Sequence, residues 1–218
     1  MPTPSILIDP SKPGMRQQVD SLAPTPGYCV FIDIVGSTAM KQKGMREWIA
    51  LIYNCFANSH FFLDQFSPIK AIGDALMFYI EIPDLKQSGY TPLQIFDGLW
   101  QLATESDPNF PAVKIGAARC EKAYSLTFLR GNQDYYGIDV DMTARLQSIA
   151  AEREIVIEQK FYDDISADYQ GIGNQEQFES YRALRGPVPE PLKGIPDKIN
   201  AYRAAASNVL PKLLPIRG

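Results

Sequence analysis

The sequence contains one histidine, His60, and three cysteines among its 218 residues. A single histidine argues against a Ser-His-Asp triad and against a histidine-based metal site, so we expect His60 to be structural. The cysteines, Cys29, Cys55 and Cys120, stand singly. This scatter is typical of reduced thiols in the cytoplasm and not of a disulfide framework or a zinc site.

Long apolar runs and an excess of basic residues are also missing. No run reaches the ~18 residues of a membrane span, and the N-terminus lacks the layout of a signal peptide. The net charge of -4 provides no general basic field for nucleic acid. With 45% apolar and 21% charged residues, the composition is typical of a globular protein with a sizeable core. We expect a cytoplasmic protein that binds neither membrane nor nucleic acid.

The chain divides into an N-terminal extended arm, residues 1–26, and one domain, residues 27–218. The arm is expected from its many prolines and its weak periodicity. The run "YCVFIDI" predicts a buried strand that ends near Asp33. A helix is predicted over residues 37–66, with Ser37 or Thr38 as its N-cap and an interruption near Gly44.

The rest of the domain reads as alternating strands and helices. A tight Gly73-Asp74 turn inside residues 68–82 predicts a hairpin, and Thr91 and Pro92 predict a helix start. Further helices are predicted over 91–106 and 138–151, and strands over 112–120, 124–130, 154–158, 177–184 and 198–205. The order predicts an α+β fold with a ferredoxin-like βαββαβ core: an antiparallel sheet, helices on one face and appended C-terminal strands.

Two carboxylates are expected to meet at one end of this sheet. Asp33 ends a buried strand and Asp74 lies at the tip of the neighbouring hairpin. Two close acids repel unless a cation compensates, and Mg²⁺ prefers a few carboxylates together with substrate phosphates. The alternative is structural, with Asp33 capping the following helix and Asp74 serving only as a turn residue.

The turn Gly36-Ser37-Thr38 supplies a second element of a site. It places free backbone N–H groups at a helix N-terminus, which favours phosphate. The stretch "FIDIVGST" therefore combines a metal carboxylate with a phosphate-binding turn.

Three segments in order, "FIDIVGST", "KAIGDALM" and "DYYGIDVDMTARL", resemble the signatures of class III nucleotidyl cyclases. "EIVIE" and "PLKGIPDKINAYRA" are similar to the closing segments of that family, so the resemblance covers roughly residues 27–204. It implies a class III cyclase catalytic domain that converts a ribonucleoside triphosphate to a 3′,5′-cyclic nucleotide and pyrophosphate.

The resemblance implies roles for several residues. Asp33, Asp74 and the backbone carbonyl of Ile34 would bind two Mg²⁺ or Mn²⁺ ions. Arg145 matches the arginine that stabilises charge on the α-phosphate in the transition state. Lys114 falls where the family often carries a phosphate-binding base, although a solvated strand lysine is the alternative. Lys193 is a weaker phosphate candidate.

Lys70 and Asp134 match the two positions that read the base in this family, in the combination associated with adenine. A lysine donor and a carboxylate acceptor do not suit guanine, but they suit adenine, cytosine or uracil. Two positions depart from the family. Asp141 stands where an asparagine usually positions the ribose, and Cys120 replaces a second glycine.

The family's active site lies between two chains, so the resemblance implies a homodimer. In its whole-chain form the sequence resembles stand-alone pyrimidine cyclases of bacterial anti-phage (Pycsar-type) systems, whose cyclic UMP or cyclic CMP activates a separate effector. A pyrimidine cyclase is therefore expected. The alternatives are an adenylate cyclase, a catalytically silent nucleotide binder motivated by Asp141, and a polymerase-palm enzyme, which "DYYG…AR" does not support.

Overall fold

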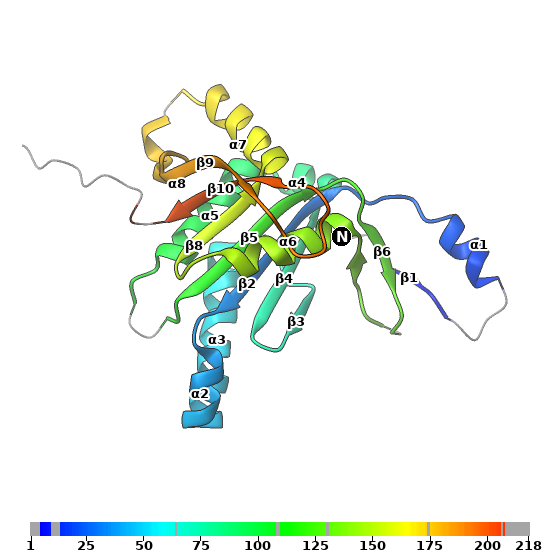
Figure 1. Cartoon of the computed structure of the whole chain (residues 1–218), viewed down its shortest axis with the longest axis horizontal. Helices are drawn as coiled ribbons and strands as arrows, with labels where there is room; N and C mark the ends of the chain where they lie inside the picture. The colour runs from blue at the N-terminus through cyan, green and yellow to red at the C-terminus, as the bar shows by residue number, and fades with distance from the viewer. Residues whose placement is uncertain are drawn as a thin grey trace, which may run out of the picture.

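A seven-stranded sheet forms the centre of the protein (Figure 1). The computed structural model describes residues 5–9, 14–63, 65–107, 110–129, 131–173, 175–205 and 207. The strand order is β3-β4-β2-β5-β8-β10-β9. These strands are β2 (Gly27–Ile34), β3 (Lys70–Ile72), β4 (Ala75–Glu81), β5 (Val113–Cys120), β8 (Glu154–Glu158), β9 (Leu184–Glu190) and β10 (Ile199–Ala205).

All neighbouring strands of this sheet are antiparallel except β5 and β8, which are parallel and joined through helix α6 (Ile138–Ile149). The predicted α+β class is confirmed. The other helices are α1 (Met15–Asp20), α2 (Ser37–Lys43), α3 (Met45–Phe62), α4 (Ile82–Ser88), α5 (Pro92–Thr104), α7 (Gln159–Gly171) and α8 (Glu179–Ala183). None of the helices in the described ranges is long and apolar enough to cross a membrane.

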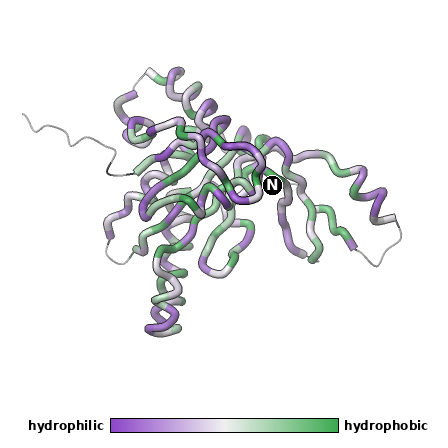
Figure 2. The backbone as a smooth tube through the Cα atoms, in the orientation of Figure 1, coloured by the Kyte–Doolittle hydropathy of each residue, from purple (hydrophilic) through white to green (hydrophobic). Residues whose placement is uncertain are grey.

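Strand β2 is buried on both of its faces, and this explains its unbroken apolar run. Its alternate side chains enter two different clusters. Val30 and Ile32 pack in the large core with α3, α5 and α7, whereas Cys29 and Phe31 pack on the other side with Val140 of α6. The expectation that helices cover one face is therefore wrong, because α6 covers the second. Figure 2 shows both hydrophilic and hydrophobic residues along the helical extension formed by α2 and α3.

The predicted interruption at Gly44 is confirmed, because α2 ends at Lys43 and α3 begins at Met45. The predicted N-cap is wrong: Gly36, with φ of 75°, is the N-cap residue, and no side chain caps α2. A positive φ favours glycine, which has no Cβ to clash.

The hairpin and the helix start at Thr91 are confirmed. Gly73 has φ of 67° in the turn between β3 and β4. Thr91 and Gln94 form a reciprocal capping box at the start of α5, with Pro92 as the first helical residue.

Two other local predictions need correction. Within residues 1–26, Ile6–Leu7 form strand β1 and Met15–Asp20 form helix α1, so the described part of this segment is not wholly extended. The stretch 177–184 was expected as a strand, but it contains the short helix α8. Strand β9 lies instead in the proline-rich 184–190, a position open to proline because β9 is an edge strand.

A second, three-stranded sheet extends beside the main one in the order β1-β6-β7 (Figure 1). Its members are β1 (Ile6–Leu7), β6 (Tyr124–Thr127) and β7 (Tyr135–Tyr136). Strand β7 lies between the strand predicted over 124–130 and the helix predicted over 138–151, in the stretch "GNQDYYG" for which neither element was predicted. We call β6, β7 and the residues between them the arm hairpin. It is not part of the N-terminal arm, residues 1–26, but strand β1 of that arm pairs with its strand β6.

Candidate active site

The structure brings Asp33 and Asp74 together, as the sequence predicted. Asp33 lies opposite Ala75 in the β2–β4 pairing, next to the turn that carries Asp74. Burial raises the pKa of Asp33, and the nearby Asp74 carboxylate raises it further. This end of the sheet thus concentrates negative charge in a half-buried position, which a cation would stabilise.

Three groups support the Asp33 carboxylate. Gln147 of α6 donates from Nε2 to Asp33 Oδ2 over 3.1 Å. The backbone N–H of Ile34 and the charge of Lys114 both act to lower the Asp33 pKa. Lys114 lies opposite Asp33 in β5, so the two side chains share a face of the sheet. Sequence reasoning missed Gln147 because its contact depends on how α6 crosses the sheet.

Asp74 is linked to the glycine turn through Lys41 of α2. Lys41 Nζ lies 3.9 Å from Asp74 Oδ1 and 4.5 Å from the centre of the Trp48 ring. Trp48 Nε1 donates to the buried hydroxyl of Ser37 over 2.8 Å. The turn Gly36-Ser37-Thr38 and the two carboxylates therefore belong to one connected region, in which Thr38 is exposed and Ser37 is buried.

The donor set fits a hard divalent cation better than a soft one. Among the described residues there is no group of three or more His, Cys, Asp or Glu that could hold a metal. Two carboxylates and a backbone carbonyl are oxygen ligands. Mg²⁺ uses such a small set when substrate phosphates and water complete its coordination.

Helix α6 lies close against β5 because Gly116 has no side chain. A Cβ at Gly116 would lie 2.3 Å from the backbone N of Gln147 and 2.6 Å from the carbonyl O of Thr143. The Thr143–Gln147 side of α6 therefore faces the sheet. Arg145 lies about 200° around the helix from either residue. Arg145 and Asp141 are exposed on the outer side, one helical turn apart. Gln147 faces the sheet and contacts Asp33, whereas Arg145 of the same chain faces away from the sheet.

The two predicted base-reading residues are in direct contact. Lys70 Nζ donates to Asp134 Oδ1 over 2.6 Å, and Lys70 lies 5.6 Å from the centre of the Tyr136 ring. Tyr136 and Phe128 meet edge to face with ring centres 5.6 Å apart. These four side chains line a cavity of about 390 Å³ beside the arm hairpin. The cavity offers a hydrogen-bond donor in Lys70, a hydrogen-bond acceptor in Asp134 and the aromatic surfaces of Tyr136 and Phe128.

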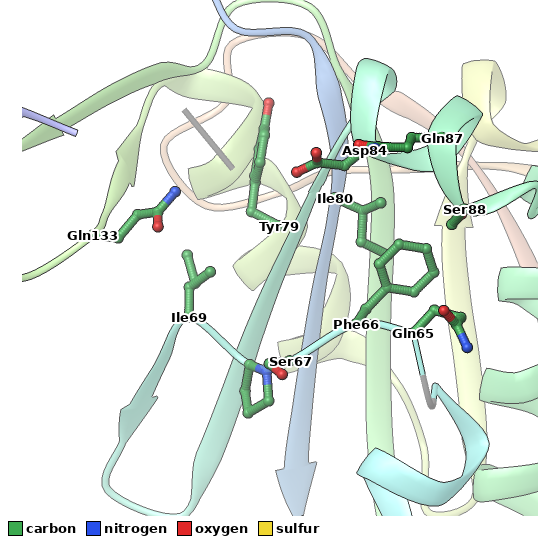
Figure 3. A pocket seen from close by; sticks show the side chains of 11 residues that line it. Gln65, Phe66, Ser67, Ile69, Tyr79, Ile80, Asp84, Gln87, Ser88 and Gln133 are labelled. Atoms are coloured by element: carbon green, nitrogen blue, oxygen red, sulfur yellow. The ribbon is translucent and has the colours of Figure 1, made fainter. Parts of the chain in front are cut away.

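A larger cavity of about 590 Å³ lies on the other side of Ile69 and Gln133, which line both cavities. Figure 3 shows Gln133 and Ile69 on one side of it, and Phe66 and Asp84 on the other. Neither Asp33 nor Asp74 lines it. Both cavities thus lie next to the Lys70–Asp134 pair and not at the carboxylates.

The remaining predicted residues lie outside these clusters. Lys193 is exposed in the segment between β9 and β10, whose neighbours Leu192 and Ile195 pack in the cluster that contains Leu146 of α6. Cys120 is buried, and like Cys29 and Cys55 it is a free thiol. The side chain of His60 lies outside the described part of the chain.

Comparison with known proteins identifies the domain. Residues 27–189 match the family described as "Adenylate and Guanylate cyclase catalytic domain", and a search of curated protein sequences gave no significant match. That family match spans well over half of the chain and includes both carboxylates, Arg145 and the Lys70–Asp134 pair.

Solved structures share the fold at low sequence identity. The adenylyl cyclase CyaB of P. aeruginosa is 15% identical, with a TM-score of 0.65 over 85% of this chain and 96% of that one. An adenylate cyclase of Trypanosoma brucei, solved in its monomeric state, is 16% identical, with a TM-score of 0.62 over 87% and 94%. The guanylate cyclase domain of RhGC from Catenaria anguillulae, in complex with GTP, is 16% identical, with a TM-score of 0.58 over 83% and 96%. On the family match and the shared fold, the chain belongs to the family of adenylate and guanylate cyclase catalytic domains and is a nucleotidyl cyclase.

Proposed function

We propose that this nucleotidyl cyclase converts a pyrimidine ribonucleoside triphosphate, UTP or CTP, to its 3′,5′-cyclic nucleotide and pyrophosphate. Asp33 and Asp74, with the Ile34 carbonyl, hold two Mg²⁺ or Mn²⁺ ions. The observation that carries the metal site is the pairing of two carboxylates at the end of β2, where burial and the nearby Asp74 raise the pKa of Asp33.

Divalent ions held by Asp33, Asp74 and the Ile34 carbonyl would lower the pKa of the ribose 3′-hydroxyl and would neutralise charge on the triphosphate. The chain's own residues do the rest. Gln147 orients Asp33 through its 3.1 Å hydrogen bond. The turn Gly36-Ser37-Thr38 offers backbone N–H groups to the phosphates, and Lys114 adds positive charge on the same face as Asp33. The 3′-oxygen attacks the α-phosphorus, and pyrophosphate leaves.

The second half of the site comes from another copy of the chain. Arg145 stabilises the charge that develops on the α-phosphate, and Asp141 accepts a hydrogen bond from the ribose. Their outward orientation on α6 supports this proposal, because each faces away from the carboxylates of its own chain. A homodimer would thus contain two equivalent sites.

Base selection rests on Lys70 and Asp134. Lys70 donates to a carbonyl or ring nitrogen, and Asp134 accepts from the cytosine amine or from the uracil N3–H. The pair disfavours guanine, whose O6 calls for a donor. The same groups satisfy adenine, so ATP is the alternative substrate. The resemblance to stand-alone bacterial pyrimidine cyclases favours UTP or CTP, with the product serving as a messenger to a separate effector in anti-phage defence.

A catalytically silent binder is the second candidate function. The exposed Asp141 carboxylate motivates it, because an ionised carboxylate near a triphosphate adds repulsion and cannot donate a hydrogen bond. Tight nucleotide binding without turnover would identify it.

One incubation distinguishes these functions: the purified protein with Mn²⁺ and all four ribonucleoside triphosphates, read by mass spectrometry. Cyclic UMP or cyclic CMP is expected as the main product. Cyclic AMP as the main product would replace the pyrimidine assignment by the adenine one, and bound nucleotide without any cyclic product would support the silent binder.

The metal assignment is tested in the same assay. Asp33→Ala is expected to lower product formation at least about 100-fold, since metal binding supplies several kcal/mol of charge stabilisation. Asp197→Ala, at an exposed aspartate before β10, is the matched control and should retain parent activity. An active Asp33→Ala protein would contradict the assignment.

A further inference from the structure

The N-terminal segment is bound to the residue proposed to read the base. Ser5 Oγ donates to the backbone carbonyl of Asp134 over 3.0 Å and accepts from the backbone N–H of Asp134 over 3.0 Å. It also lies 3.1 Å from the hydroxyl of Ser125 on β6. We propose that Ser5 is a positioning residue for base selection, which holds the Asp134 backbone so that its carboxylate meets the nucleobase. This inference rests on the proposed role of Asp134.

The hydrogen bonds of Ser5 form a complete set. A hydroxyl has one proton to donate and two lone pairs that accept. The contact between the Ser5 and Ser125 hydroxyls, 3.1 Å apart, is a further hydrogen bond in which either oxygen could be the donor. Both backbone groups of Asp134 are therefore bound by one side chain that lies 129 residues earlier in the chain.

The Asp134 side chain depends on this backbone position. Its Oδ1 accepts from Lys70 Nζ over 2.6 Å and from the backbone N–H of Tyr135 over 2.8 Å. A shift of the Asp134 backbone would change the direction of the carboxylate and of Lys70 together. Base discrimination by a carboxylate requires placement within a fraction of an ångström, because hydrogen bonds weaken steeply with poor geometry.

The arm hairpin needs such support. Its paired strands β6 and β7 are short, and two-stranded hairpins are marginally stable in water. Strand β1 adds a third strand, pairing in parallel with β6. The backbone N–H of Ile8 donates to the Thr127 carbonyl over 2.8 Å, and the Ile8 side chain is 2% exposed. These main-chain and apolar contacts would remain if only the Ser5 hydroxyl were removed.

The test compares nucleotide selectivity in the full-length chain. Selectivity is the ratio of kcat/KM for the preferred nucleotide to that for the next best one. Ser5→Ala should lower this ratio about threefold to tenfold through a higher KM, the scale expected for lost hydrogen bonds. Ser5→Thr keeps the hydroxyl and should retain parent selectivity. Ser5→Val has the shape of the threonine variant but no hydroxyl, and it should behave like Ser5→Ala. Ser21→Ala, which removes an exposed hydroxyl of the same segment, should change nothing.

The Asp134→Asn variant separates the two proposals. It should alter selectivity by itself, and adding Ser5→Ala to it should cause no further loss. If Asp134→Asn leaves selectivity unchanged, base reading by Asp134 is wrong. If Asp134→Asn does alter selectivity, two results would overturn the positioning role of Ser5. One is equal selectivity of the Ser5→Val and Ser5→Thr proteins. The other is an effect of Ser5→Ala that persists in the Asp134→Asn protein. The Thr and Val pair decides the question even where Ser5→Ala is too unstable to assay.

Discussion

At the scale of single residues, the proposed metal ligand Asp33 is a carboxylate whose ionisation costs free energy in the folded chain. Burial and Asp74 hold its pKa above the ordinary value in the folded chain. The folded state therefore binds its proton more tightly than the unfolded state does. Stability falls as the pH rises from the ordinary pKa through the raised one, and the deficit persists at higher pH.

Asp33→Asn removes this deficit. In metal-free buffer with a chelator, we expect its free energy of unfolding to exceed that of the parent at pH 7, and the gap to close below about pH 4, where the parent carboxyl is protonated in both states. Urea unfolding at several pH values measures the gap. Asp197→Asn should show none. A parent protein more stable than Asp33→Asn at neutral pH would contradict this account.

At the scale of elements, the close packing of α6 on β5 decides where Gln147 and Arg145 lie. Gly116→Ala would place a Cβ 2.3 Å from a backbone nitrogen of α6, and neither element can yield locally. We expect a loss of about 1–3 kcal/mol in the free energy of unfolding, together with lower cyclase activity as Gln147 moves from Asp33. Thermal or denaturant unfolding and the product assay measure the two effects.

The control is Gly171→Ala at the end of α7, where an added Cβ would meet no atom of the described residues within 4 Å. Its stability should stay within about 0.5 kcal/mol of the parent or rise slightly. Equal stability of the Gly116→Ala and Gly171→Ala proteins would show that α6 does not depend on the close approach at Gly116.

At the scale of the whole molecule, the outward Arg145 and the inward Asp33 lead to a complementation test. Asp33→Ala and Arg145→Ala should each be inactive. Mixed in equal amounts and allowed to exchange subunits, they should recover about a quarter of parent activity, because about half of the dimers are mixed and each has one intact site.

A second mixture makes this result specific to a shared site. Asp33→Ala with Asp74→Ala alters the same half of the site, so no mixed dimer contains an intact one, and activity should stay absent. Activity in this second mixture would contradict a site built from two chains. So would an inactive first mixture in which subunit exchange has been demonstrated.

Local features of the fold were predictable to different degrees. The β2 strand, the Gly73-Asp74 turn and the Thr91 cap follow from residues adjacent in the chain, and all three were predicted correctly. The capping residue of α2 was missed because Ser and Thr are the usual N-cap residues, whereas here Gly36 occupies the N-cap in a left-handed conformation. Strand β9 was missed because prolines are compatible with a strand only at a sheet edge, and edge position is not a local property.

The sequence by itself determined the family, the order of the core elements, and which residues are candidates for metal, phosphate and base. Such information lies in short motifs and in local backbone preferences. Only the tertiary structure decided that α6 covers the second face of the sheet, that Gln147 binds Asp33, and that Ser5 binds Asp134. Those contacts join residues 114 and 129 positions apart. They depend on strand order and on the packing of α6 at Gly116, which no local pattern encodes.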